Sequence, residues 1–267
     1  MSRRDTGTDK LLLDVADGIA RVTFNNPAKR NALSVEMRSA LPKAVQSLQD
    51  DPEVRVVILT GAGNEAFISG ADISEFGERR TSVESRAEYD RGAADFGRAW
   101  LALDKPVIAQ IRGFCLGGGL ITALNADVRI ASDDARFGIP AARLGLGYGF
   151  GGVDALARVV GSAWAAEILF SARRLIAQEA LTAGLVSRVV PGERLEGEVT
   201  ALAHAIRDNA PLTVAACKAA LREWQREPAK RDLAGVAARV EACFRSDDYR
   251  EGQRAFAEKR RPRFGGS

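Results

Sequence analysis

Two patterns of hydrophobic and polar positions predict the β-strands of this chain. In 18–25 (GIARVTFN) the two classes alternate among residues that favour β-structure, which predicts a strand ending at the following Asn-Pro turn. In 54–60 (VRVVILT) and 106–111 (PVIAQI) apolar residues run almost without interruption, which is typical of strands buried on both faces. A shorter strand is predicted at 127–131.

Hydrophobic residues at helical spacing predict the helices. Residues 37–48 carry apolar side chains on one face of a helix for which Ser34 is the predicted N-cap, and Pro42 is expected to kink this helix or to mark its start. Further helices are predicted at 81–103, 120–126, 163–170, 177–183, 195–209, 213–226, 230–245 and 248–259.

Strands alternate with helices up to about Pro191, and helices alone follow, which predicts an α/β layered core with a helical C-terminal region. We therefore expect a disordered polar N-terminus at 1–10, a core domain at 11–191 and a helical region at 192–267. The final segment, 260–267, is also expected to be disordered.

The composition narrows the possible functions. The 267 residues are 46% hydrophobic and 27% charged, as in an ordinary soluble globular protein. A net charge of only +3 argues against a dedicated nucleic-acid-binding protein, and no apolar run is long enough to span a membrane. The N-terminus lacks a secretory signal and the three cysteines are scattered, so the cytoplasm is the expected location.

Residue types exclude several kinds of active site. The single histidine, His204, lies in an apolar-striped helical segment without the partners of a Ser-His-Asp triad, so an ordinary helical position is expected. No Cys or His pair has the spacing of zinc ligands, and no metal is expected. Gly147, Gly149 and Gly152 match a dinucleotide fingerprint, but no buried strand precedes them, so we reject that match.

Two glycine-rich turns follow the buried strands. The strand at 54–60 leads into GAGNEAFISGADI, and the strand at 106–111 leads into RGFCLGGG and then a helix. Glycine permits close approach to the backbone, and a helix N-terminus presents unpaired N–H groups to a developing negative charge. The spacing alone fits tight packing of helix against sheet equally well.

Five segments, in order, resemble those of one family. AFISGADISEF at 66–76 and VIAQIRGFCLGGGLITALNADVRIAS at 107–132 resemble the two signature segments of the enoyl-CoA hydratase/isomerase (crotonase) superfamily. NPAKRNALS at 26–34, FGIPAARLGLGYGFGG at 137–152 and AFAEKRRPRF at 255–264 resemble its other segments. The resemblance implies the α/β crotonase (ClpP/crotonase-like) fold, a spiral of ββα units whose C-terminal helices join subunits in a homotrimer or hexamer.

The resemblance also implies an acyl-coenzyme A substrate and assigns roles to positions. The backbone N–H groups of Ala71 and Gly118 match the two donors of the family's oxyanion hole, which holds the oxygen of a thioester enolate. No separate cofactor is implied, because coenzyme A belongs to the substrate. The positions that match coenzyme A contacts are Lys29, Arg30, Ala32, Ser69, Asp72, Ile73, Phe256 and Lys259, of which the last two reach a neighbouring subunit in many members.

This sequence departs from the family at both hydratase glutamates. The first position, three residues after the middle glycine, is Ile121, and the second, directly after Pro140, is Ala141. Neither side chain can exchange a proton, and the loss of one positioned acid or base costs about 10²–10⁴-fold in rate. We therefore expect a lyase or isomerase of the family that is not an efficient hydratase.

Two alternatives remain open. Tyr148 resembles a tyrosine of the superfamily's acyl-CoA decarboxylases, so one alternative is decarboxylation of a malonyl-type thioester; there Tyr148 either donates a proton or packs against the pocket. Arg143 then either holds the substrate carboxylate or lies at the surface. The other alternative is a catalytically silent acyl-CoA-binding protein. Among nearby carboxylates, Asp72 is expected to make a structural hydrogen bond, and Glu75 and Asp154 carry no assigned role.

Overall fold

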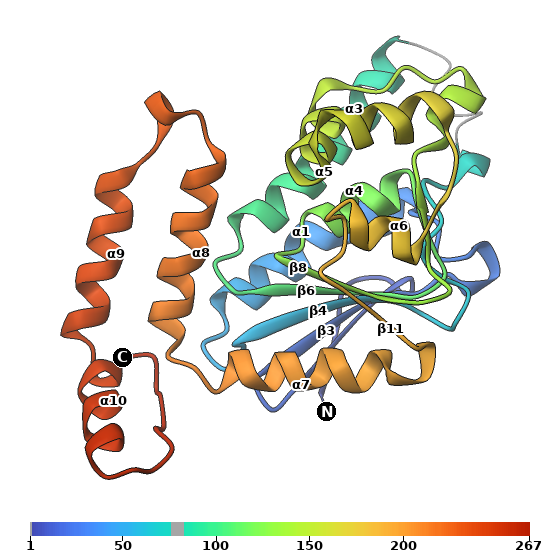
Figure 1. Cartoon of the computed structure of the whole chain (residues 1–267). Coiled ribbons are helices and arrows are strands. Elements are labelled where there is room, and N and C mark those ends of the chain that lie inside the picture. Colours follow the sequence, from blue (N-terminus) through green and yellow to red (C-terminus); the bar gives the residue numbers. More distant parts are fainter. Residues whose placement is uncertain (1, 76–82) are drawn as a thin grey trace.

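The computed structural model of the chain describes residues 2–75 and 83–267, and Figure 1 shows its elements. The described strands are β1 (Ser2–Arg4), β2 (Leu11–Ala16), β3 (Ile19–Phe24), β4 (Val56–Gly61), β5 (Ala66–Ile68), β6 (Val107–Ile111), β7 (Phe114–Leu116), β8 (Val128–Ser132), β9 (Arg136–Gly138), β10 (Leu175–Ile176) and β11 (Arg188–Val190). The α-helices are α1 (Val35–Asp50), α3 (Val83–Ala102), α4 (Gly118–Leu124), α5 (Phe150–Ser171), α6 (Ala177–Thr182), α7 (Leu195–Arg207), α8 (Pro211–Gln225), α9 (Leu233–Arg245) and α10 (Asp247–Ala257).

The larger sheet has the strand order β1-β2-β3-β4-β6-β8-β11, and its strands from β3 to β11 are parallel. Helices cover both of its faces, with α1, α4 and α6 on one side and α7 on the other (Figure 1). In β4, Val57 and Leu59 belong to the main hydrophobic cluster, whereas Val56 and Ile58 pack with residues of α7. The prediction of a strand buried on both faces at 54–60 is therefore confirmed.

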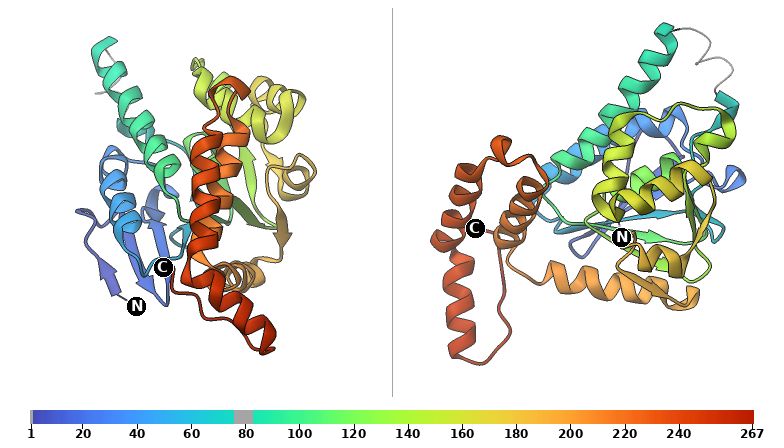
Figure 2. Two further views of the ribbon diagram at one scale, coloured as in Figure 1. Left: turned by 90° about the vertical axis from the view of Figure 1, so that its left-hand side faces the viewer. Right: turned by 45° about the horizontal axis from the view of Figure 1, so that its top comes forward.

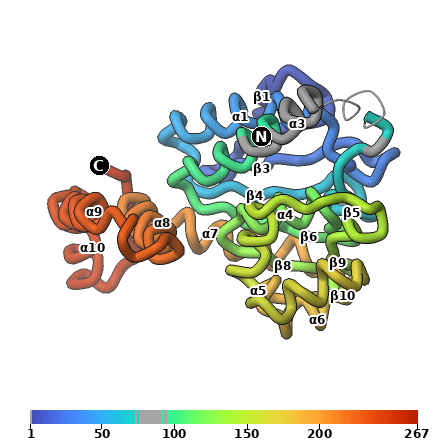
Figure 3. The backbone as a smooth tube through the Cα atoms, turned by 90° about the horizontal axis from the view of Figure 1, so that it is seen from above, coloured from blue at the N-terminus to red at the C-terminus, as the bar shows by residue number. Residues whose placement is uncertain are grey.

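A smaller sheet with the order β10-β9-β7-β5 lies beside the larger one. Its strands arise from a repeat, because a strand of the large sheet is followed by a short strand of the small sheet and then by a helix: β6, β7 and α4, and likewise β8, β9 and α5. In Figure 3 these turns are seen from above, with β5 and β9 on one side of the core. The predicted spiral of ββα units is the observed fold.

Several element boundaries differ from the prediction. The element α5 consists of two helices joined at Gly161, whose φ of 74° is not helical. The helix after Gly161 contains the predicted range 163–170, whereas the helix before it, which begins at Phe150, was not predicted. The first helix begins at Val35, and the Ser34 side chain accepts a hydrogen bond from the Met37 N–H, so the predicted N-cap is confirmed. Pro42 lies inside that helix and does not mark its start. Residues 81 and 82 of the helix predicted at 81–103 lie outside the described residues.

Both chain ends are ordered where disorder was expected. Ser2–Arg4 pairs antiparallel with β2, and the Asn25 N–H donates to the Lys10 carbonyl, so the prediction for 1–10 is wrong for the described residues 2–10. At the other end, Asp248 accepts hydrogen bonds from the N–H groups of Gly265 and Gly266. The partners of both segments are remote in sequence, so their local polarity gave no sign of this order.

The helices α8, α9 and α10 stand to one side of the core, as the two views in Figure 2 show. Lys218 of α8 anchors them, because its Nζ donates to the Lys105 carbonyl and to Asp127, each at 2.7 Å. Burial lowers the pKa of Lys218, although the partner Asp127 opposes this shift. None of the helices in the described part of the chain has both the length and the apolar character that crossing a membrane requires.

Candidate active site

The N–H of Ala71 points away from the segment with which its neighbours pair. Leu33 donates its N–H to the Gly70 carbonyl at 2.8 Å and accepts one from the Asp72 N–H at 3.0 Å. Successive backbone groups of an extended chain point to opposite sides, so the Ala71 N–H between these two bonds faces the other way. No acceptor for it lies among the described residues.

Gly118 lies beside Ala71 at the start of a helix. It is the first residue of α4, and the first N–H groups of a helix have no intrahelical acceptor. A Cβ atom built on Gly118 would lie 3.8 Å from the Ala71 nitrogen and 4.0 Å from the Gly70 carbonyl carbon. The two positions that the sequence pairs as backbone donors are therefore adjacent in space.

The glycines on either side of Gly118 make this approach possible. Gly117 has a φ of 51°, which favours glycine, and its N–H donates to the Gly138 carbonyl at 2.8 Å. A Cβ atom on Gly119 would lie 2.2 Å from the Ile68 carbonyl oxygen, so only glycine fits there. The tight packing expected of the glycine run is present at Gly119, which packs α4 against β5, while Gly118 lies beside Ala71.

A polar cluster lies next to Ala71. The Lys29 Nζ donates to Asp72 Oδ2 and to the Ser74 hydroxyl, each at 2.8 Å, and the Ser69 hydroxyl donates to the Lys29 carbonyl at 3.2 Å. Asp72 is 6% exposed. Burial raises the pKa of Asp72, but the hydrogen bonds from Lys29 and Ser74 outweigh it, so the pKa lies below its usual value. The structural hydrogen bond expected of Asp72 is present, and half of the Lys29 side chain remains exposed.

The other residues predicted to contact coenzyme A in this part of the chain, Arg30, Ala32 and Ile73, differ in solvent exposure. Arg30, at a φ of 50°, places its guanidinium 5.3 Å from the centre of the Phe114 ring and lines a surface pocket with residues 62–66. Ala32 is buried. Ile73 begins a short 3₁₀ turn, and its side chain lies outside what the structure describes.

Asn31 holds the loop that carries Lys29 and Arg30, and sequence analysis missed it. It is fully buried, its Nδ2 donates to the carbonyls of Ala62 and Ala66 at 2.9 and 2.7 Å, and its Oδ1 accepts from the Asn26 N–H at 3.0 Å. Its φ of 56° is a conformation that asparagine tolerates better than most residues. The only feature of the sequence that could have indicated this role is the presence of an asparagine within the NPAKRN turn.

Both residues in place of the hydratase glutamates are apolar. Ile121 is half-buried and its N–H donates to the Gly117 carbonyl, which places it one turn into α4. Ala141 is buried in the 3₁₀ turn Pro140–Leu144, which follows β9, the strand paired with β7. Arg143 in the same turn is exposed.

Tyr148 follows this turn and packs against the start of α5. A Cβ atom on Gly152 would lie 2.6 Å from Tyr148 Cε1, so the ring lies directly over that glycine. Burial raises the pKa of Tyr148 above its usual value, and none of the described residues forms a hydrogen bond with its hydroxyl. The hydroxyl therefore remains protonated at neutral pH.

Phe256 and Lys259 lie far from Ala71 within one chain. Phe256 belongs to α10 and Lys259 follows it, on the side of the molecule where α8–α10 stand apart from the core (Figure 2). The Phe256 side chain is 88% exposed, and among the described residues Lys259 has no carboxylate partner. A single chain does not bring this pair to the two donors.

Other kinds of site find no support in the described residues. His204 is exposed on α7, as expected of an ordinary helical histidine. Across the parts of the chain that are described, no group of three His, Cys, Asp or Glu residues is arranged to hold a metal ion.

Comparisons with known proteins agree with this geometry. The family model described as enoyl-CoA hydratase/isomerase matches residues 14–267. A short-chain-enoyl-CoA hydratase of Clostridium acetobutylicum is 39% identical over 253 residues, covering 95% of this chain and 96% of that protein. A crotonyl-CoA hydratase of Syntrophomonas wolfei is 37% identical, with 96% and 98% covered.

A solved structure shares the fold, with a sequence identity close to that of these two relatives. It is an enoyl-CoA hydratase/carnithine racemase from Magnetospirillum magneticum, with a TM-score of 0.91, 35% sequence identity and 97% of each chain covered. Because the family model and these relatives match nearly the full length of the chain, the chain belongs to the enoyl-CoA hydratase/isomerase family.

Proposed function

We propose that this protein acts on an acyl-CoA thioester and stabilises its enolate with the backbone N–H groups of Ala71 and Gly118. The observation that carries the proposal is the 3.8 Å between the Ala71 nitrogen and a Cβ atom built on Gly118. Removal of one such donor costs about 3–4 kcal/mol of transition-state stabilisation in an acyl-transfer enzyme, so two fixed donors support substantial catalysis.

We propose further that hydration is not its efficient reaction, although relatives are named hydratases. Ile121 and Ala141 occupy the glutamate positions, and the three nearby carboxylates already have partners. Asp72 is held by Lys29, Glu75 accepts the Val35 N–H at 2.9 Å, and Asp154 pairs with Arg158 at 2.7 Å. None of these three is free to activate water without losing a contact of the fold.

The second candidate function is decarboxylation of a malonyl-type CoA thioester, which Tyr148 favours. In that reaction the bond between the α-carbon and the carboxylate breaks, CO₂ leaves, and the electron pair forms the enolate held by Ala71 and Gly118. The α-carbon then takes the proton of the Tyr148 hydroxyl, and water returns a proton to the tyrosinate. The step requires no carboxylate base, and the raised pKa of Tyr148 keeps the donor protonated.

We propose that the active assembly contains several copies of the chain, as a homotrimer or a hexamer. Phe256 and Lys259 can serve a coenzyme A site only if another copy supplies that site, because α10 stands apart from its own core. The outer helices also expose large apolar side chains, a feature typical of subunit interfaces: Leu221, Trp224, Leu233, Val240, Phe244 and Tyr249.

The cytoplasm remains our proposed location. Cys115, Cys217 and Cys243 are all free thiols in the structure. Free cysteines without disulfides are usual in reducing compartments.

The test is mass-spectrometric turnover of the purified protein on crotonyl-CoA, a 3-enoyl-CoA and methylmalonyl-CoA. We expect slow or no addition of water to crotonyl-CoA. Loss of CO₂ from methylmalonyl-CoA that falls in a Tyr148→Phe variant supports the decarboxylase, and a shifted double bond in the 3-enoyl-CoA supports an isomerase. Rapid hydration refutes the argument from Ile121 and Ala141, whereas tight binding without any turnover identifies a silent acyl-CoA-binding protein.

A further inference from the structure

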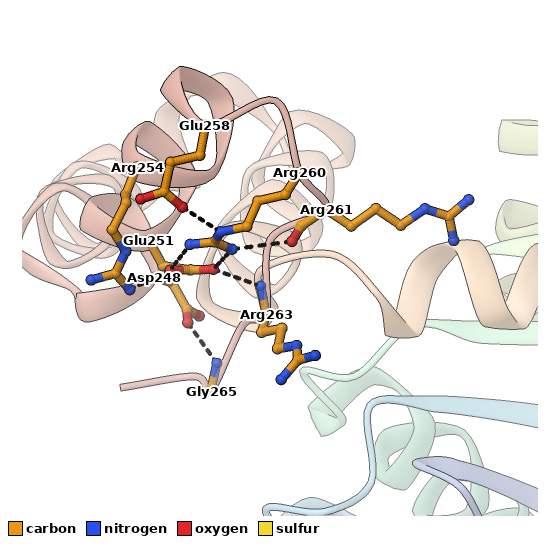
Figure 4. Close-up of polar contacts among 8 residues, drawn as sticks. All are labelled: Asp248, Glu251, Arg254, Glu258, Arg260, Arg261, Arg263 and Gly265. Atoms are coloured by element: carbon orange, nitrogen blue, oxygen red, sulfur yellow. Dashed lines mark hydrogen bonds and ion pairs between the residues drawn. The ribbon is translucent and has the colours of Figure 1, made fainter.

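Glu251 on α10 lies at the centre of an ionic clamp that holds the C-terminal tail. Its carboxylate accepts hydrogen bonds from Arg260 Nη1 at 2.6 Å and Nη2 at 3.0 Å, from the Arg263 backbone N–H at 3.0 Å, and from Arg254 (Figure 4). Glu251 is 7% exposed. The hydrogen bonds from Arg260 and Arg254 hold the pKa of the Glu251 carboxyl far below its usual range, so the clamp is ionised at all physiological pH values.

The clamp closes around a tight turn at the end of α10. The Arg260 N–H donates to the Ala255 carbonyl at 3.0 Å, the Lys259 N–H donates to the Phe256 carbonyl at 3.2 Å, and Lys259 has a φ of 55°. This left-handed conformation is disfavoured for lysine, and glycine is the usual residue at such a helix end. The bidentate pair of Arg260 with Glu251 holds the chain directly after the strained residue.

The turn carries two side chains, those of Phe256 and Lys259, that do not contribute to holding it. Phe256 is 88% exposed, and Lys259 has no carboxylate partner among the described residues, although Glu258 and Glu251 on either side are both engaged by Arg260. An aromatic face and a nearby ammonium group together suit a planar base and a phosphate. A nucleotide presents both.

We infer that Glu251 is a positioning residue that fixes Phe256 and Lys259 for the nucleotide portion of an acyl-CoA bound to another copy of the chain. The inference rests on the proposed function, and it adds to it a residue that touches no substrate. Glu251 acts through Arg260, since that pair sets the direction in which the strained Lys259 leaves α10. The expected effect is therefore confined to ligands that carry the nucleotide.

The test compares two ligands by titration calorimetry on the intact oligomer: acetyl-CoA, and acetyl-pantetheine, which lacks the nucleotide. We expect Glu251→Gln to weaken acetyl-CoA binding about tenfold and to leave acetyl-pantetheine binding unchanged, because only the oriented contacts are lost. Arg260→Met breaks the same pair from the other side and should give the same loss. The double variant should be no worse than either single variant.

Glu241→Gln is the matched control, because it removes a carboxylate that pairs with Arg245 on α9, outside the clamp. It should bind both ligands as the wild type does. Unchanged acetyl-CoA affinity in both Glu251→Gln and Arg260→Met overturns the inference, and so does equal weakening of both ligands. If Glu251→Gln does not fold, the affinities of Arg260→Met for the two ligands decide whether the inference holds. A wild type that binds neither ligand refutes the proposed function itself, and with it this inference.

Discussion

Gly119 of α4 and Ile68 of β5 are so close that a Cβ atom on the glycine would lie 2.2 Å from the Ile68 carbonyl oxygen and 2.7 Å from its Cβ atom. The atoms that obstruct the new methyl group are backbone and branched side chain, which cannot rotate away. We expect Gly119→Ala to lower the free energy of unfolding by about 1–3 kcal/mol or to prevent folding, as overpacking does elsewhere. Urea denaturation followed by circular dichroism measures the change; a variant as stable as the wild type contradicts this packing.

Gly118→Ala should separate function from stability. The nearest atoms to the new methyl group are at 3.5 and 3.8 Å, which is ordinary contact, so the variant should fold with a stability within about 1 kcal/mol of the wild type. The methyl group would nevertheless lie beside the Ala71 nitrogen, where the thioester oxygen is proposed to bind. We expect acyl-CoA binding and turnover to fall at least about tenfold. Unchanged turnover in this variant would place the oxyanion site elsewhere.

Asn31→Ala should destabilise the loop that carries Lys29. The substitution leaves the buried carbonyls of Ala62 and Ala66 without their donor, and each unsatisfied buried group costs about 1–3 kcal/mol. Thermal denaturation should show a clear decrease in Tm. Asn64→Ala is the control, because Asn64 is exposed and its side chain accepts a single hydrogen bond, from Arg112, among the described residues; the variant should melt close to the wild type. Equal melting of the two variants would contradict the proposed role of Asn31.

Restoring the two glutamates should create hydratase activity. We expect the double variant Ile121→Glu/Ala141→Glu to hydrate crotonyl-CoA at least about 10²–10⁴-fold faster than the wild type, which is the factor that a single positioned acid or base contributes. Loss of absorbance of the enoyl thioester follows the reaction. Arg143→Glu adds a carboxylate at an exposed position of the same turn and should give no gain. If the wild type already hydrates as fast as the double variant, another base is present.

Tyr148 should make stability sensitive to alkaline pH. Its pKa is raised by burial in the folded state, so the folded protein keeps this proton after the unfolded chain, with a tyrosine pKa of about 10, has released it. The contribution is therefore complete below about pH 10 and is lost as the pH rises from there toward the folded pKa. Between about pH 9 and pH 11 the wild type should lose roughly 1 kcal/mol more stability than Tyr148→Phe. Parallel pH curves for the two proteins would show that the hydroxyl is solvated.

Much of the core could be predicted because its signals are local. The apolar run at 54–60 has no polar face to turn toward water, so it can only form a strand covered on both sides. Ser34 caps the helix that follows it because its side chain and the Met37 N–H are three residues apart. The glycine run likewise marked the place where strand and helix come together.

Tertiary structure decided what local patterns could not. The three-residue strands β5, β7 and β9 are too short for periodicity to show, and they exist because each pairs with the next turn of the spiral. Residues at 2–4 and 260–267 are polar, yet they are ordered by β2 and by α10. The role of Asn31 was missed because the carbonyls that it holds, those of Ala62 and Ala66, are more remote in the chain than a local pattern reaches.

The sequence by itself determined the buried strands, the capped helices, the glycines and the absence of the two glutamates. Only the tertiary structure brought the Ala71 nitrogen beside Gly118 and set α10, the helix that carries Phe256, apart from the core. The physical reason is that hydrophobic burial and backbone preferences act on neighbours along the chain, whereas the approach of Ala71 to Gly118 depends on the parallel pairing of β5 with β7.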